Sequence, residues 1–371
     1  MRSYDNYGFL GKTNANMIGA ILLFFLVVKY YRHILFHSVG YPLTTISTQI
    51  TIIISIILII NDLKKYNIFH FLLLVLFFIQ FKVTNNNTII YTYTLALALC
   101  NRDLKKIFKV YIIINVMFFI SCLLLNFVGI KPSGYIHGRN NLGFGNPNGA
   151  YMAFFIIWVA YLYVKFDKLD KKEFVILTIS PLIIYIQTRT QTGLVTIFTC
   201  MIIVLIFKYI NINKKIYKWI FSIYPILLTT LSLVLAYKFN NHYWINEYLS
   251  HRPYYWHKYL TNPTYGLNFV GYSSDIKRIA FMPKIPLDSG YIWTLYSTGI
   301  ISFLLILFLY VYALYTLCCE NKKAEVLLIL SILTYSFAES IILDLAVNLS
   351  FIFIPYAITK LRNRNKIFKY R

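Results

Sequence analysis

The sequence predicts an all-α, polytopic membrane protein with about twelve transmembrane helices and one large extracytoplasmic loop. Of its 371 residues, 58% are hydrophobic and only 13% are charged, whereas a soluble domain has about 25% charged residues. The hydrophobic residues come in long runs, and about 20 of them suffice to cross a bilayer. We therefore expect a single integral membrane domain over residues 1–371, with a large loop at 238–290.

Apolar runs between polar residues predict twelve spans. The fourth of them is short, and almost no polar sequence separates the last two. The predicted spans are 17–31, 43–61, 68–83, 88–100, 107–128, 147–165, 173–187, 193–210, 218–237, 291–317, 326–343 and 345–359.

Basic residues in the short connections predict the orientation of the spans. Alternate connections are lysine-rich, as in the stretches 102–109, 165–172 and 208–218, and the C-terminal tail is basic as well. Because such loops stay on the cytoplasmic side, we expect a multi-pass protein of the cell membrane with both termini in the cytoplasm. The loop at 238–290 then lies outside. The first span lacks a cleavage site and should remain as an anchor.

The charge balance and the cysteines exclude several functions. There are 36 Lys and Arg against 13 Asp and Glu, which gives a net charge of +23. The basic residues lie in short connections, where anionic membrane lipid is their expected partner, and no nucleic-acid-binding motif accompanies them. The five cysteines show no CxxC spacing, so the sequence predicts neither a disulfide scaffold nor a zinc site.

The first polar segment on the predicted outer side reads HGRNNLGFGNPNG. Gly143 and its neighbouring glycines let backbone amides approach an anion, and Arg139 offers a guanidinium suited to phosphate oxygens. Asn146 and Pro147 predict the start of a helix, with Asn148 in its first turn. The simpler interpretation is a Gly/Asn turn that caps this helix, with Arg139 at the lipid headgroups.

Two further segments carry polar groups on the same predicted side. Arg189 lies among three threonines between two spans, either in a polar cavity or at the interface of a short hairpin. The large loop is rich in Tyr and Trp and contains His251, Arg252 and Asp288. Aromatic faces stack on sugar rings, and His or Asp can take a proton from a hydroxyl. The simpler interpretation of the loop is an interfacial lid with an aromatic belt.

Two acids lie in or near the last spans, Glu339 and Asp344. Carboxylates within a bilayer are costly and mark functional positions. They could form a proton relay, as in a transporter, or pair with an external arginine and hold the helices together.

Four motifs in this order resemble the Wzy-type oligosaccharide repeat-unit polymerases of the O-antigen ligase and polymerase superfamily. The resemblance covers most of the chain from about residue 107 onward. The motifs are Arg139 with Leu142-Gly143-Phe144-Gly145-Asn146-Pro147-Asn148, Thr188-Arg189-Thr190, His251-Arg252-Pro253 with Asn262-Pro263-Thr264-Tyr265-Gly266, and Asp288-Ser289-Gly290-Tyr291 followed by Thr298-Gly299-Ile300.

The resemblance implies a GT-C-like, metal-independent glycosyltransferase without a cofactor. Its members polymerise a cell-surface polysaccharide such as capsule, exopolysaccharide or O-antigen. They move the growing chain from undecaprenyl pyrophosphate onto the non-reducing end of a lipid-linked repeat unit at the outer face of the cytoplasmic membrane. The substrate is then an undecaprenyl-pyrophosphate-linked oligosaccharide, and a flippase and a chain-length regulator are candidate partners.

The resemblance also assigns roles to residues of this chain. Arg139, Arg189 and Arg252 match outer arginines and are expected to bind pyrophosphate. Asp288 stands where the ligase branch has a histidine, which makes Asp288 the candidate base and His251 the reserve. Gly143, Asn146, Asn148 and Gly266 are expected to support the loops and the helix cap.

Three alternatives stand beside the polymerase. An O-antigen-type ligase would perform the same chemistry on a different acceptor. A polysaccharide flippase or transporter would move the lipid-linked unit without making a bond, and Glu339 and Asp344 would then matter more than the loop. A non-catalytic membrane scaffold would leave the outer arginines unexplained.

Overall fold

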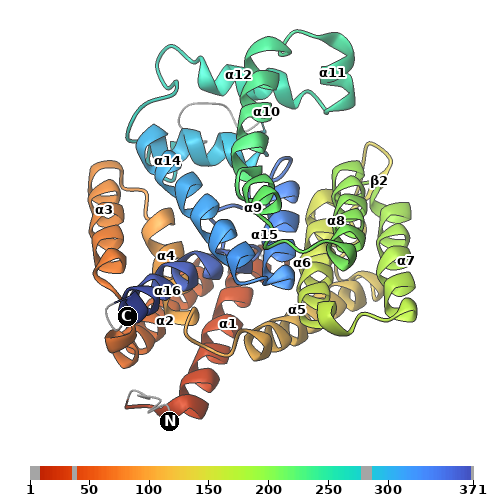
Figure 1. Ribbon diagram of the computed structural model, residues 1–371. Helices are drawn as coiled ribbons and strands as arrows, with labels where there is room; N and C mark the ends of the chain where they lie inside the picture. Colours follow the sequence, from red (N-terminus) through yellow and green to blue (C-terminus); the bar gives the residue numbers. More distant parts are fainter. Residues whose placement is uncertain (1–8, 36–39, 277–285, 369–371) are drawn as a thin grey trace. The chain divides into compact units, whose positions relative to one another are not determined.

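The computed structural model describes residues 9–35, 40–276 and 286–368, and these residues are predominantly helical (Figure 1). Contacts divide the chain into two compact units. Unit 1 comprises Met1–Tyr66 and Thr94–Ile210, and unit 2 comprises Asn67–Tyr93 and Asn211–Arg371. The single membrane domain expected over 1–371 stays a prediction.

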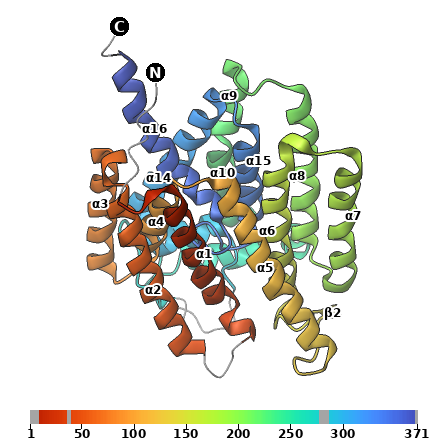
Figure 2. The ribbon, with the colours of Figure 1, turned by 90° about the horizontal axis from the view of Figure 1, so that it is seen from below.

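Unit 1 is a bundle of helices with one short β-hairpin. Helix α1 packs against α2 and α5, α5 packs against α6, and α6 packs against α7 and α8, an order that can be followed in Figure 2. The elements are α1 (Gly11–Leu35), α2 (Gly40–Asn61), η1 (Leu63–Lys65), the second half of α4 (Thr88–Leu99), α5 (Leu104–Phe127), β1 (Tyr135–Ile136), β2 (Arg139–Asn140), α6 (Pro147–Lys165), η2 (Phe166–Lys168), α7 (Lys171–Thr188) and α8 (Gln191–Tyr209).

Unit 2 is built around its longest helix, α14, which contacts α9, α10, α15 and α16. The two short helices α11 and α12 lie in the predicted loop at 238–290, and α12 packs against α10 and α14. The elements are α3 (Ile68–Thr84), the first half of α4, α9 (Lys215–Ser222), α10 (Tyr224–Lys238), α11 (Tyr243–Tyr248), α12 (Arg252–Leu260), α14 (Gly290–Cys319), α15 (Lys323–Tyr335), η3 (Leu349–Ile352) and α16 (Phe353–Phe368).

Several helices could cross a membrane. Among the described residues, six are long and apolar enough, or seven if α9 and α10, bent by 40°, form one broken span. Shorter apolar helices lie at Ile68–Thr84, Thr88–Leu99 and Leu349–Lys360. The expected all-α class with several helices long and apolar enough to cross a membrane is confirmed. The number of twelve spans stays a prediction.

The prediction of a helical span over 326–343 is wrong at its C-terminal end. Helix α15 ends at Tyr335, and the chain then runs without a helix to Asn348. This segment is nevertheless largely buried, because local bonds satisfy its backbone; for example, the Asn348 side chain donates to the Ile342 carbonyl at 2.7 Å. Non-helical backbone is tolerated at membrane depth when it is packed within protein and hydrogen-bonded. Apolarity predicted the burial but not the backbone conformation.

Helix α14 is interrupted at Gly299, whose φ of 78° and ψ of 166° are non-helical. The loop segment around Gly271 crosses it there, so close that a Cβ on Gly299 would lie 2.3 Å from the Gly271 nitrogen. Backbone bonds join the two segments, from Tyr272 N to Ser297 O at 2.9 Å and from Ile300 N to the Asn268 carbonyl at 3.1 Å. The loop therefore supplies partners that the broken helix lacks. We call this junction the loop–helix crossing.

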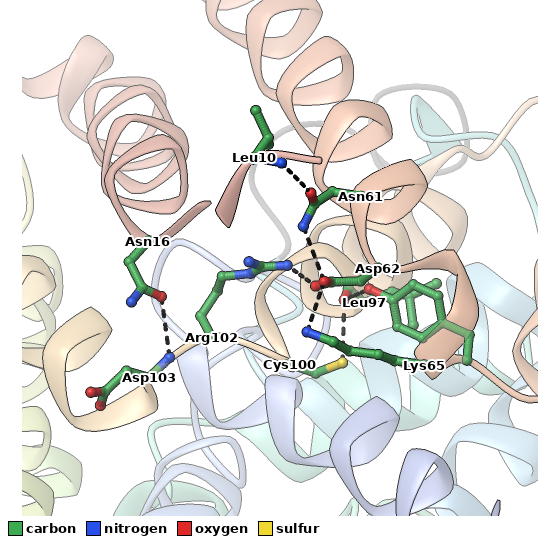
Figure 3. A network of polar contacts seen from close by, with 10 residues as sticks. Leu10, Asn16, Asn61, Asp62, Lys65, Leu97, Cys100, Arg102 and Asp103 are labelled. Atoms are coloured by element: carbon green, nitrogen blue, oxygen red, sulfur yellow. Dashed lines mark hydrogen bonds and ion pairs between the residues drawn. The ribbon is translucent and has the colours of Figure 1, made fainter. Parts of the chain in front are cut away.

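A buried ion pair lies in unit 1, where the end of α2 meets the turn after α4 (Figure 3). The Arg102 guanidinium contacts the Asp62 carboxylate. Lys65 Nζ lies 3.0 Å from the same carboxylate, and Asn61 donates to it at 3.1 Å. The Asp62 side chain is fully buried and that of Arg102 is 4% exposed. Burial lowers the pKa of Arg102 to about 10, so the guanidinium remains charged at neutral pH.

Candidate functional site

A tight hairpin sets the position of Arg139 in unit 1. Strands β1 and β2 pair antiparallel, with Ile136 opposite Arg139. The two residues between the strands, His137 and Gly138, have φ of 50° and 71°, the left-handed conformations of a two-residue hairpin turn. Arg139 therefore follows a fixed turn and is half-buried.

The Arg139 guanidinium is held by residues of three helix ends. Its Nε donates to the Thr188 carbonyl at 2.9 Å, at the end of α7. Its Nη2 donates to Thr190 Oγ1 at 3.0 Å and also to Asn148 Oδ1, in the first turn of α6. We call Arg139, Asn148, Thr188, Arg189 and Thr190 the Arg139 site. These hydrogen bonds hold the Arg139 guanidinium in place without a bound ligand.

The N-termini of α6 and α8 contribute a positive electrostatic potential to the Arg139 site. Asn146 is the N-cap of α6 and accepts from Asn148 N at 2.9 Å, and Pro147 follows in the first turn. Thr190 is the N-cap residue of α8. Backbone N–H groups at such helix starts favour anions. The Arg139 site thus combines a guanidinium with the first turns of α6 and α8.

The glycine-rich loop before α6 is ordered by its own asparagines. The Asn141 carboxamide oxygen accepts from the nitrogens of Gly134 at 2.9 Å and Gly143 at 3.0 Å. Gly143 has φ of 79°, and a Cβ on it would lie 3.1 Å from Asn126 Cβ. Gly143 therefore shapes the loop by its backbone.

Arg189 adds a second, exposed arginine to the Arg139 site. It ends α7 in a left-handed conformation with φ of 45°, and its side chain is exposed. Its two chain neighbours, Thr188 and Thr190, are the ones that hold Arg139. The site therefore pairs the fixed guanidinium of Arg139 with the exposed side chain of Arg189, which lies in the chain between two of the residues that hold Arg139.

Arg252 lies in unit 2, at the first position of α12. It is 8% exposed, and its Nη2 lies 4.0 Å from Glu339 Oε1. Its Nε is buried with no hydrogen-bond partner among the described residues. Of the two interpretations of Glu339, pairing with an arginine is therefore the one observed. Asp344 lies exposed in the non-helical segment, where it accepts from Ala346 N at 3.0 Å.

Asp288 lies just before the N-cap of α14, Ser289, and is half-buried. Burial, together with the negative charge of Asp288, raises the pKa of Tyr259 in α12 to about 12. The next residue but one, Gly290, donates its N–H to the Ser336 carbonyl at 2.7 Å. The start of α14 thus packs against the turn that carries Glu339. We call Arg252, Tyr259, Asp288 and Glu339 the Arg252 site.

His251 has a different environment. It is the N-cap residue of α12 with φ of 58°, its side chain is about half exposed, and its Nε2 lies 3.6 Å from Glu247 Oε2. Gly266 lies further along the loop, where a Cβ would lie 2.5 Å from the Asn262 carbonyl oxygen. Gly266 therefore permits a close turn.

The sequence shows Glu339 as an acid in an apolar stretch, but it gives no local signal for a catalytic carboxylate there. Because Glu339 lies opposite Arg252, the Arg252 site contains two acids, Glu339 and Asp288. Among the described residues, no group of three His, Cys, Asp or Glu side chains could hold a metal ion. No protein-family model, curated protein or solved structure matches this chain, so its function is inferred from these residues and their geometry.

Proposed function

We propose that this chain is a glycosyltransferase of the cell membrane that polymerises a cell-surface polysaccharide. It transfers the growing chain from undecaprenyl pyrophosphate to the non-reducing end of a lipid-linked repeat unit. The observation that carries the proposal is the Arg139 site, where a guanidinium bonded at 2.9 Å and 3.0 Å lies beside two helix starts and an exposed arginine. Such a site suits a diphosphate.

The proposed topology follows from the charge of the connections. The protein has twelve spans of a GT-C-like arrangement, with both termini in the cytoplasm and the 238–290 loop outside. Reporter enzymes that are active only outside the cytoplasm test it. Fusions at Asn140 and Asn240 should be active, and a fusion at Asn213 inactive. An inactive fusion at Asn140 or Asn240 would refute the outer location of the sites.

The reaction needs positive charge for the leaving group and a base for the acceptor. The acceptor hydroxyl oxygen attacks the anomeric carbon, the bond from that carbon to the pyrophosphate oxygen breaks, and the pyrophosphate leaves with the electron pair. In this proposal Arg139, Arg189 and Arg252 are each assigned to pyrophosphate, whose negative charge arginines can stabilise without a metal. Asp288 takes the hydroxyl proton. The half-buried position of Asp288 supports this role more than the exposed position of His251 does.

A purified lipid-linked repeat unit gives the direct test. Wild-type protein should produce a ladder of longer lipid-linked species and release undecaprenyl pyrophosphate. Arg139→Ala and Arg252→Lys should insert normally and make no ladder. Lys258→Ala, an exposed residue of the same helix as Arg252, is the control and should be active. A wild-type protein that moves the unit across the bilayer without lengthening it would be a flippase and would refute the proposal.

A further inference from the structure

Five aromatic side chains of unit 2 form a contiguous cluster. Tyr296 of α14 is central, with ring centroids 5.4 Å from Tyr259, 5.1 Å from Tyr272 and 6.4 Å from Trp293. Tyr265 extends the cluster, 6.3 Å from Tyr272. We call these five residues the aromatic cluster. It joins α12, the following loop and the first turns of α14.

The aromatic cluster has a buried floor and a partly open rim. Tyr259 and Tyr296 are 1% and 0% exposed, whereas Tyr265, Tyr272 and Trp293 are half-buried. The Tyr296 hydroxyl is buried and has no hydrogen-bond partner among the described residues. A buried hydroxyl without a partner is unfavourable, so a water or a polar ligand that reaches it would be stabilised.

The rim is rigid because the loop–helix crossing holds it. Tyr272 is bonded through its N–H to Ser297, and its hydroxyl donates to the Gly266 carbonyl. Asn86, from the turn before α4, donates to the carbonyls of Tyr272 at 3.1 Å and Ser297 at 3.2 Å. These bonds fix the backbone on which the rim rings stand. A preorganised surface binds with a smaller loss of conformational entropy.

The aromatic cluster adjoins the candidate base. Asp288 directly precedes Ser289, the N-cap residue of α14, and burial together with the negative charge of Asp288 raises the pKa of Tyr259. Trp293 lies one helical turn after the N-cap Ser289, to whose carbonyl its N–H donates at 2.8 Å. A ligand on these rings would therefore lie beside the start of α14.

We propose that the aromatic cluster is a carbohydrate-binding subsite, which stacks sugar rings of the acceptor oligosaccharide beside Asp288. The apolar faces of sugar rings pack on aromatic rings, and their hydroxyls bond to polar edges. The assignment to the acceptor rests on the proposed polymerase function, whereas binding of the sugar can be measured without any reaction.

The probe is a set of lipid-free oligosaccharides, obtained by partial acid hydrolysis of the surface polysaccharide of the cell that carries the gene. Calorimetry with the purified full chain should show binding. Tyr265→Leu and Tyr272→Leu should each weaken it about tenfold. Tyr272→Phe keeps the ring and should bind within about threefold of the wild type, which separates stacking from the hydroxyl bond.

Two exposed aromatic residues provide a matched control. The ring centroids of Tyr243 and Trp244 of α11 lie 5.4 Å apart, and the residues are 68% and 74% exposed. Among the described residues, no ring contact joins either of them to the aromatic cluster. Trp244→Leu should leave sugar binding unchanged. Melting curves of all variants in detergent check that they remain folded.

The outcomes separate this inference from the proposed function. Failure of the wild type to bind the oligosaccharides would overturn the subsite. Folded leucine variants with unchanged affinity would also overturn it, even if the protein polymerises. Binding that depends on Tyr265 and Tyr272 in a protein that makes no polymer would support the subsite and refute only the polymerase. In an active polymerase, the leucine variants should raise KM for the acceptor about tenfold.

Discussion

Replacing either partner of the buried Asp62–Arg102 pair should destabilise the protein strongly, and replacing both should cost no more than replacing one. The side chains are 0% and 4% exposed, and removing one member of such a pair costs about 3–5 kcal/mol, because it leaves a buried charge uncompensated. Arg102→Met leaves Asp62 with Lys65 at 3.0 Å. We therefore expect a loss at the lower end, about 3 kcal/mol.

Asp62→Leu should cost about 4 kcal/mol, because the buried guanidinium of Arg102 loses the carboxylate that compensates it. The double variant removes both charges and should lose only about 3 kcal/mol. The coupling energy between the two positions is then about 4 kcal/mol. Equilibrium unfolding in mixed micelles with increasing SDS at pH 7, followed by circular dichroism, measures all four proteins.

An exposed pair nearby serves as the control. Lys106 Nζ lies 3.8 Å from Asp103 Oδ2, and the Lys106 side chain is 72% exposed. Lys106→Met should change the free energy of unfolding by less than about 0.5 kcal/mol. If the losses of Arg102→Met and Asp62→Leu simply add in the double variant, the reasoning about the buried pair is refuted.

Three further predictions concern the sites and the crossing. Arg139→Lys keeps the charge but loses the fork of bonds, so initial rates of polymer formation should show kcat/KM reduced about 30-fold, or about 2 kcal/mol; an unchanged value would contradict the fixed guanidinium. Glu339→Gln removes the counterion of the buried Arg252, and SDS unfolding should show a loss of about 2 kcal/mol, whereas an unaltered midpoint would mean that the 4.0 Å pair contributes nothing. Gly299→Ala should lower the free energy of unfolding by at least about 3 kcal/mol, because of backbone strain and overlap with the loop. Gly138 also has a positive φ but has open space around it, so Gly138→Ala should cost only about 1–2 kcal/mol. Thermal unfolding measures both variants.

The apolar runs of the sequence predicted most helices well, because burial in lipid or protein requires long apolar stretches with internal hydrogen bonds. The span expected at 68–83 is helix Ile68–Thr84, and the cap at Asn146 begins α6 as its Asn-Pro sequence indicates. The helix predicted after Tyr335 does not form. The backbone carbonyls and amides of this stretch are instead hydrogen-bonded by side chains and in turns.

Features that depend on distant residues were not predictable from local pattern. Asn86 reaches the loop–helix crossing from 186 and 211 positions away in the sequence. The interruption of α14 at Gly299 depends on this contact with the loop. Within the site, the threonines beside Arg189 were noted, but only the fold shows that they hold Arg139. The pairing of Glu339 with Arg252 was one of two open interpretations for the same reason.

The discontinuity of unit 2 has a consequence for synthesis on the ribosome. Helix α3 is made early, and the stretch 94–210 of unit 1 follows before any later residue of unit 2 exists. Buried His70 of α3 bonds to the Tyr93 hydroxyl at 2.9 Å and to Thr359 Oγ1 at 3.0 Å. Its second partner is therefore translated almost 290 positions later. In the nascent chain, the His70 imidazole has only one of its two partners until α16 is made. A premature stop before Thr359 would therefore leave His70 of α3 without its second hydrogen bond.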